Sequence, residues 1–185
     1  LFNTRSGKPV CTVAPGLQLI VMAYVRGKTF YDLSRTPNNN ELALICAEAV
    51  KINNIQYEPD YIFDSWAIPN MKWMYEKTRG HLSAEGLSLV EKAFELYGSI
   101  PLNDLPKCFV HGDLIKTNII LGEDKKIYVL DFAVSNVYPR IQELAVMAAN
   151  LMFDDKAESN TSLKDRTNLI LEAYTAAGGE LTQIE

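Results

Sequence analysis

Cysteine and histidine are scarce in this sequence, which has three cysteines and two histidines among 185 residues. Cys11, Cys46 and Cys108 are far apart, lie in apolar surroundings and form no C-x-x-C pair. Spacing of this kind argues against the dense disulfide framework of a small secreted domain. We therefore expect three buried, reduced thiols in a cytoplasmic protein.

Long hydrophobic runs and clusters of basic residues are also missing. The longest apolar stretch, Leu17–Val25, is interrupted by Gln18 and is too short to span a bilayer. The net charge is −5 and the Lys and Arg residues are dispersed, so we expect neither a membrane nor a nucleic acid as a partner. With 48% hydrophobic and 22% charged residues, the composition is that of a globular domain with a substantial core.

The most informative segment is the motif H-G-D-L-I-K-T-N at residues 111–118, followed thirteen residues after its Asn by Asp131 and Phe132. Apolar stretches precede both, at residues 108–110 and 127–130, and each predicts a strand. Between them, residues 119–121 are apolar and residues 122–126 have the composition of a turn. The sequence therefore predicts a tight β-hairpin directly after the motif.

Folding this hairpin brings Asn118 and Asp131 to the same end, with Asp113 on the loop just before it. Two carboxylates and an amide oxygen then converge on one small volume. Hard oxygen ligands of this kind suit Mg²⁺, which proteins hold with one or two carboxylates while substrate phosphates complete its shell. The pattern indicates a site for phosphoryl transfer.

The motif and the L-D-F after it resemble the catalytic loop and the metal-binding Asp of kinase-like phosphotransferases, in the aminoglycoside phosphotransferase and choline kinase branch. Protein kinases have H-R-D at the loop and D-F-G at the later motif, whereas Gly112 and Ala133 stand here in place of the Arg and the last Gly. The resemblance implies an α+β protein kinase-like fold. It covers a mostly helical C-terminal lobe with a catalytic β-hairpin, and the last strands of a truncated N-terminal lobe.

The resemblance also implies roles for residues of the motif. Asp113 would act as the catalytic base toward the substrate hydroxyl, and Asn118 and Asp131 would hold Mg²⁺. We expect His111 to be structural, with hydrogen bonds to the backbone. Lys116 has two readings, a contact to a phosphate or an exposed surface lysine.

A nucleotide site follows from the same resemblance. The strand that ends near Arg26 and Gly27 corresponds to the hinge between the lobes, so the carbonyl of Ala23 and the amide of Val25 would bond the adenine edge. Ile120 and Leu130 would form the apolar floor beneath the base. The phosphate donor would be ATP, with GTP as an alternative.

The sequence lacks the two parts that cover the nucleotide phosphates in the family, a Gly-rich loop and a Lys-bearing strand. The ten glycines are scattered, and no V-A-I-K-like strand is present. We accordingly divide the chain into residues 1–25, the end of an N-terminal lobe with its hinge strand, and residues 26–185, a helical C-terminal lobe, and expect both ends to be truncated. The same absences leave an alternative from another class: a non-catalytic lobe that acts as a pseudokinase or binding module, or an inactive fragment.

Helical periodicity accounts for most of the remaining chain. We expect helices at residues 41–52, capped within 38–40, after Ser83 as far as Gly98, at 140–152, and at 163–177 before the Gly178-Gly179 stop. Residues 60–79 are rich in aromatics and fit no single period. The resemblance implies that an insertion at this place can form part of the substrate wall, but core packing is the expectation for these rings.

The acceptor is less well defined than the chemistry. Relatives that share this loop phosphorylate hydroxyl groups of aminoglycosides, homoserine, choline or ethanolamine, and methylthioribose, so the expected partners are a nucleotide and a small hydroxyl-bearing substrate. Glu143, in P-R-I-Q-E-L-A at residues 139–145, stands where the family usually has the Asp of D-L-A. We expect only a minor structural or substrate-edge role for it. The sequence does not indicate an oligomeric state.

Overall fold

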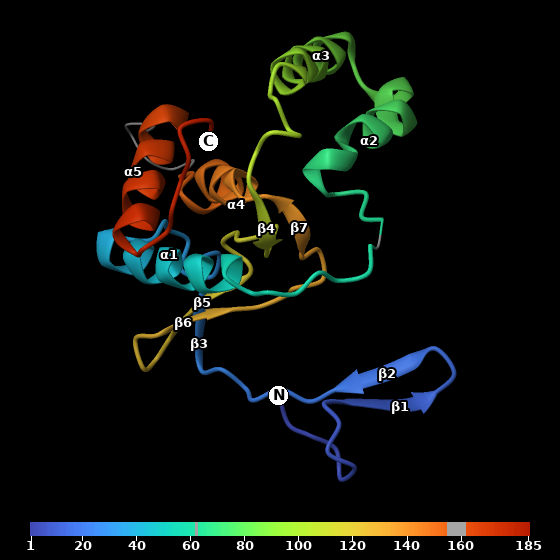
Figure 1. Ribbon diagram of the computed structural model, residues 1–185, viewed down its shortest axis with the longest axis vertical. Coiled ribbons are helices and arrows are strands. Elements are labelled where there is room, and N and C mark those ends of the chain that lie inside the picture. Colours follow the sequence, from blue (N-terminus) through green and yellow to red (C-terminus); the bar gives the residue numbers. More distant parts are fainter. Residues whose placement is uncertain (62, 155–161) are drawn as a thin grey trace.

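The computed structural model describes residues 1–61, 63–154 and 162–185 and contains both helices and strands (Figure 1). The strands are β1 (Val10–Ala14), β2 (Leu17–Ile20), β3 (Gly27–Thr29), β4 (Lys107–Val110), β5 (Ile119–Gly122), β6 (Ile127–Val129) and β7 (Asn136–Pro139). The helices are α1 (Asn39–Asn53), α2 (Met71–Thr78), α3 (Ala84–Gly98), α4 (Ile141–Val146) and α5 (Leu163–Ala176). Short helical turns cover Ile68–Asn70 and Arg79–His81, and a π-helical turn, η3 (Met147–Leu151), continues α4.

The strands form three small antiparallel sheets. β5 and β6 make the predicted hairpin, with Ile119 opposite Val129, and β3 pairs with the other edge of β5. β4 pairs with β7. Because β4 leads into the motif and β5 leaves it, both ends of residues 111–118 are fixed by strand pairing.

Helix α1 confirms the predicted helix and its cap. The Asn38 side-chain oxygen accepts the N–H of Glu41 at 3.0 Å, and the Glu41 carboxylate accepts the N–H of Asn38 at 2.8 Å, which is a capping box. The Arg35 guanidinium also bonds this carboxylate and lowers the pKa of Glu41. The apolar stripe of α1 is buried in the core; its members are Leu42, Ile45, Ala49 and Ile52.

The main core lies where α1, α5, α4–η3 and the inner face of the β5–β6 hairpin meet. Leu114, in the middle of the motif, is fully buried there. A polar chain runs beside it: the Tyr174 hydroxyl donates to Asn53 Oδ1 at 2.8 Å, and Asn53 Nδ2 donates to the carbonyl of Phe109 at 3.1 Å. Leu114 thus anchors the loop in the core, because moving its side chain would require the core to open.

The predicted helix at 140–152 is present but changes its winding. It begins as α4 and widens into η3, where the N–H of Met152 bonds the carbonyl of Met147. The residues expected to face inward, Leu144, Ala148 and Leu151, are at most 1% exposed. Helix α5 and its stop at Gly178, which has φ +91°, are also as predicted.

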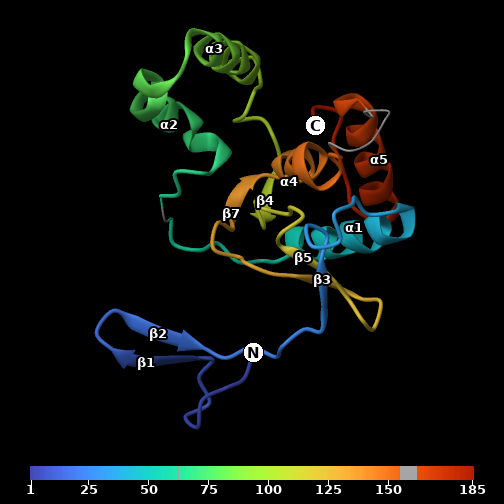
Figure 2. The same cartoon turned by 180° about the vertical axis from the view of Figure 1, so that it is seen from behind.

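Helices α2 and α3 stand apart from the rest of the body in both views (Figures 1 and 2). The predicted face of α3 (Leu87, Val90, Phe94 and Tyr97) is half-buried, and the Phe94 ring meets Tyr75 of α2 edge-on at 5.0 Å. Neither helix has a fully buried residue. A second contact joins the two helices, because the Tyr75 hydroxyl donates to the Glu91 carboxylate at 3.3 Å.

The expectation that the aromatics of residues 60–79 pack in the core is wrong. Trp66 is 83% exposed, and Phe63 and Trp73 are about half exposed and contact one another edge-on at 4.9 Å. The reason is that this segment connects the body to the projecting α2–α3 pair, so most of its rings have no second layer to pack against.

The prediction of a buried strand over Leu17–Val25 is also wrong. Strand β2 ends at Ile20, and its apolar side chains are about half exposed, because β1 and β2 form a two-stranded ribbon that no other described segment covers (Figures 1 and 2). Cys11, on β1, is exposed for the same reason; Cys108 is half-buried, and only Cys46 is fully buried as predicted. Across the described ranges, no helix is both long enough and apolar enough to cross a membrane.

Candidate active site

The hairpin brings the motif and the later Asp together as predicted. The N–H of Leu130 donates to the carbonyl of Asn118 at 2.9 Å, just beyond the last paired residues of β5 and β6. Asp131 follows directly, so it lies at the same end of the hairpin as Asn118. This juxtaposition results from strand pairing over a short separation, which is why the sequence pattern sufficed to find it.

Asn118 holds Asp113 in place through two hydrogen bonds. Its Nδ2 donates to Asp113 Oδ2 at 2.7 Å and to the Asp113 carbonyl at 3.0 Å. One carboxylate oxygen of Asp113 is thereby fixed, and the residue lines an open pocket beside the loop. The same bonds turn the Asn118 Oδ1 away from Asp113, where the Thr117 hydroxyl approaches it at 3.3 Å.

His111 is a structural residue, as expected. Its ring is fully buried; Nδ1 accepts the N–H of Asp113 at 3.2 Å, and Nε2 lies 2.9 Å from the carbonyl of Leu130. Only a neutral ring protonated at Nε2 satisfies both bonds. Burial lowers the pKa of His111, which favours that neutral form. The ring therefore links the loop of residues 111–118 to Leu130, the residue before Asp131.

Glu143 has a larger role than the sequence suggested. Its carboxylate, fully buried, accepts the backbone N–H of His111 at 2.9 Å and that of Gly112 at 2.8 Å. Burial raises the pKa of Glu143 to about 7, and the two backbone hydrogen bonds oppose this rise. Helix α4 thus holds the loop through the two hydrogen bonds that Glu143 accepts. The match to the family's D-L-A segment was the available signal, but the two partners lie about thirty residues away in sequence.

Gly112 permits the turn on which this arrangement depends. It has φ +82°, and a β-carbon at this position would lie 3.3 Å from the carbonyl oxygen of Val134. Side chains are disfavoured in this left-handed region by about 1–2 kcal/mol.

We therefore expect Gly112→Ala to lower the free energy of unfolding by about 1–2 kcal/mol and to displace Asp113. Chemical denaturation would measure the first effect. Gly98→Ala is the matched control, because nothing lies within 4 Å of that β-carbon position at the end of α3. Equal stability of the two variants would contradict the assigned strain.

Asp131 is held in an unusual backbone conformation. Its φ is +63°, a value that is uncommon outside glycine, and its Oδ1 accepts the N–H of Ala133 at 3.3 Å. The next residue, Phe132, sets its ring edge-on against His111 at 4.5 Å. The exposed Asp131 carboxylate is therefore carried on a segment fixed to the buried part of the loop.

The donor set at this end of the hairpin fits a hard divalent cation. Asn118 Oδ1 and the Asp131 carboxylate are both oxygen donors, and the amide orientation leaves Oδ1 pointing away from Asp113. Within residues 1–61, 63–154 and 162–185, no group of three His, Cys, Asp or Glu side chains could hold a metal by itself. Two protein oxygens suit Mg²⁺, which usually completes its shell with phosphates and water.

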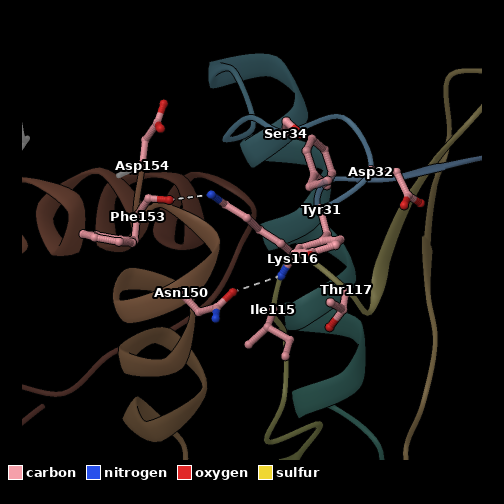
Figure 3. A pocket seen from close by; sticks show the side chains of 10 residues that line it. Tyr31, Asp32, Ser34, Ile115, Lys116, Thr117, Asn150, Phe153 and Asp154 are labelled. Carbon is pink, nitrogen blue, oxygen red and sulfur yellow. Dashed lines mark hydrogen bonds between the residues drawn. The ribbon is translucent and has the colours of Figure 1, made fainter. Parts of the chain in front are cut away.

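Lys116 does not share the pocket of Asp113. Its Nζ donates to the carbonyl of Phe153, and its backbone N–H donates to Asn150 Oδ1 at 3.2 Å (Figure 3). It lines a different pocket of about 600 Å³, together with Tyr31 and Asp32. Lys116 is therefore not a free surface lysine: it ties the loop to Asn150 of η3 and to Phe153 after it. A contact to a phosphate stays a prediction.

The residues expected at the nucleotide lie on and before the hairpin sheet. Ala23 is exposed and Val25 is half-buried, in an extended segment where neither makes a backbone hydrogen bond within the described chain. Ile120 pairs with Thr29 of β3, and Leu130 follows β6; both are half-buried. None of these four predicted residues lines the pocket of Asp113 or that of Lys116.

Comparisons with known proteins find a matching family and similar solved structures. The model of the phosphotransferase enzyme family matches residues 8–177. Similar solved structures include a choline/ethanolamine kinase family protein from Mesorhizobium loti (17% identity, TM-score 0.62). They also include a spectinomycin phosphotransferase in complex with ADP and spectinomycin (12%, 0.62) and an amicoumacin kinase in complex with AMP-PNP, Ca²⁺ and Ami (16%, 0.61).

These matches cover 94%, 97% and 96% of this chain and 56%, 58% and 55% of the respective solved chains. The chain thus spans little more than half the length of the structures it resembles. No curated protein matches it. The likeness confirms the expected α+β, protein kinase-like fold.

Proposed function

Because the chain belongs to the phosphotransferase enzyme family, we propose that it forms the catalytic lobe of a small-molecule kinase. This enzyme transfers the γ-phosphoryl group of ATP to a substrate hydroxyl. The observation that carries the proposal is the pair Asp113 and Asn118, in which one carboxylate oxygen is fixed at 2.7 Å while the residue lines an open pocket. A carboxylate held in this way is oriented before the substrate arrives.

Asp113 is the base in this reaction. The substrate oxygen forms a bond to the γ-phosphorus, the bond from that phosphorus to the bridging oxygen of ADP breaks, and ADP leaves with the electron pair. The hydroxyl proton passes to Asp113. The protein contributes mainly position and charge, since this chemistry needs little covalent help.

Asn118 Oδ1 and the Asp131 carboxylate are the proposed ligands of Mg²⁺. When bound, Mg²⁺ neutralises charge on the phosphates. His111 and Glu143 act on neither substrate; they hold the loop at the distance from the hairpin that this site requires. The AMP-PNP and Ca²⁺ in the amicoumacin kinase complex support the use of a nucleotide together with a divalent cation.

The nucleotide lies, in this proposal, against the segment before β3 and against the hairpin. The free carbonyl of Ala23 and N–H of Val25 bond the adenine edge, and Ile120 and Leu130 lie under the ring. Residues 1–25 then belong to an N-terminal lobe with its hinge, and residues 26–185 to the C-terminal lobe. ATP is the proposed donor, with GTP as the alternative.

An acceptor screen tests the proposal. Incubation of the full-length protein with Mg-ATP and pooled hydroxyl compounds should give acceptor-dependent ADP and a product that has gained one phosphoryl group, detected by mass spectrometry. A non-catalytic lobe would bind nucleotide without forming product. Binding without turnover across sugars, amino alcohols and aminoglycosides would therefore favour the pseudokinase alternative.

The metal assignment has a separate prediction. Asp131→Ala should remove most of the Mg²⁺ dependence of nucleotide binding, since one of two protein ligands is lost. Calorimetry with and without Mg²⁺ measures this, and Glu123→Ala, at the opposite end of the hairpin, is the control that keeps the dependence. A variant at Asp131 that responds to Mg²⁺ like the wild type would refute the ligand role.

A further inference from the structure

A largely buried glutamine amide beside the loop of residues 111–118 has no internal partner. Gln142, on α4, is 8% exposed, and its side chain makes no hydrogen bond within residues 1–61, 63–154 and 162–185. Buried side-chain polar atoms are nearly always paired, because taking an amide out of water without a hydrogen bond is costly. The amide thus does nothing for the described fold, which points to a group supplied from outside the chain.

The Gln142 amide is unpaired but not sealed off. Among the described residues that are not exposed, the side-chain nitrogen and oxygen atoms that are both fully buried and unpaired are Asp64 Oδ2 and Arg166 Nε. The atoms of the Gln142 amide are not among them, so they keep access to open space. Gln142 lines the same pocket as Asp113, with a volume of about 440 Å³. The accessible amide therefore lies at that pocket.

The position of Gln142 follows from how α4 meets the loop. Glu143 accepts the N–H of Gly112 at 2.8 Å, which holds the first turn of α4 against the residue before Asp113. Successive side chains of a helix point about 100° apart, so Gln142 cannot face the loop backbone as Glu143 does. It lies instead along the wall of the pocket into which Asp113 opens.

The rest of the pocket wall is mainly apolar. Ile68, Val134 and Val146 contribute aliphatic surface, and the described residues that line the pocket include no Lys, Arg or His. Tyr138 also lines it, and burial raises the pKa of this tyrosine, so its hydroxyl stays neutral. Small-molecule sites typically have this composition, an apolar wall with a few polar groups that fix the orientation of the ligand.

We propose that the Gln142 amide binds a second hydroxyl of the acceptor, close to the hydroxyl that faces Asp113; this rests on the phosphotransfer function proposed above. The amide has an acceptor oxygen and N–H donors, and a hydroxyl can donate to the first while it accepts from the second. An ammonium can only donate, so it would leave the amide N–H groups unpaired. A carboxylate can only accept, and it would meet the Asp113 carboxylate in a pocket whose described lining has no cation. The pocket therefore selects polyols over alcohols with a single hydroxyl.

Matched acceptors that differ by one hydroxyl test this selectivity. Ribose and glucose are each compared with their monodeoxy derivatives, and 1,2-propanediol is compared with 1-propanol and 2-propanol. Binding to the full-length protein is measured by saturation-transfer NMR, and phosphorylation by kcat/KM. At least one polyol should exceed an analogue that lacks one hydroxyl about tenfold or more in both measurements, because the amide is left unpaired by that analogue.

Gln142→Leu isolates the amide, because leucine has a similar size and removes both polar atoms. This variant should lose the preference for the polyol, whereas a preference due only to the hydroxyl at Asp113 would remain. Its thermal unfolding midpoint should equal or exceed that of the wild type, since the amide makes no hydrogen bond in the described fold. Gln56→Leu, at an exposed position after α1, is the control and should retain the preference.

The outcomes separate the two proposals. No binding of any polyol, equal binding of the polyols and their analogues, or an unchanged preference in Gln142→Leu would overturn the role of Gln142 whether or not phosphate is transferred. A lower unfolding midpoint of this variant would also overturn it, because the amide would then be structural. Polyol binding that depends on Gln142, without phosphorylation of any acceptor, would instead support this site and count against the kinase function.

Discussion

Asp113→Asn should lower kcat by about a hundredfold or more, the usual scale for the loss of a positioned acid or base. The asparagine can still present an oxygen to Asn118 Nδ2, so the hydrogen bond of 2.7 Å has a replacement and the loop keeps its shape. What disappears is the ability to take the hydroxyl proton. Affinity for nucleotide should change little, because Asp113 is not one of the proposed metal ligands.

Steady-state kinetics with a phosphorylated acceptor would measure the effect, with Asp104→Asn as the control on a surface loop. Thermal unfolding of both variants should match the wild type, which separates loss of chemistry from loss of fold. A kcat within a few-fold of the wild type would refute the assignment of Asp113 as the base.

Glu143→Gln should have the second-largest effect, on stability and activity together. The carboxylate accepts two backbone N–H groups, whereas the glutamine amide offers one oxygen and places N–H donors against the other. A buried N–H left without a partner costs about 1–3 kcal/mol. Since His111 and Gly112 directly precede Asp113, we expect kcat to fall about tenfold or more while nucleotide affinity is retained.

The free energy of unfolding of this variant should also depend on pH differently from that of the wild type. The pKa of Glu143 rises from 4.5 to about 7 in the folded protein, so the folded state retains a proton that the unfolded state loses in between. The contribution of Glu143 to stability is therefore complete below pH 4.5 and is lost as pH rises to about 7. A shift of this size corresponds to about 3 kcal/mol.

The difference between wild type and Glu143→Gln isolates that contribution. The lowered pKa of His111 acts in the opposite direction, adding stability above its ordinary value of 6.5, but it is common to both proteins and Glu143 is not among its causes. Urea denaturation from pH 4 to pH 8 should show the wild type losing stability relative to the variant as pH rises. Parallel curves would mean that Glu143 titrates normally.

The sequence predicted those parts of the site that depend on short-range pairing. Asn118 and Asp131 lie at the same end of the hairpin because a five-residue turn closes it, and α1 begins where the Asn38–Glu41 capping box places it. Such features follow from neighbours in the chain and need no knowledge of the rest of the fold. The predicted loop, hairpin and helices were accordingly found where the pattern placed them.

The errors concern burial and long-range contacts. Apolar residues of β2 look like a core strand, but burial requires a covering layer, and none is supplied by the described chain. The anchoring by Glu143 spans about thirty residues, and Gln142 lines the pocket of Asp113 only because α4 is held against the loop. No periodicity in the sequence encodes such contacts, because they are fixed only when helices and loops take their places in space.

Because α2 and α3 stand apart from the body, their sequences are free to diversify. These helices have no fully buried residue, and the segment that supplies one wall of the pocket of Asp113 leads into them. Surface substitutions away from buried features usually change stability by less than about 0.5 kcal/mol. Helices α2 and α3 can therefore vary in sequence at little thermodynamic penalty, whereas the loop around the buried His111 and Leu114 cannot.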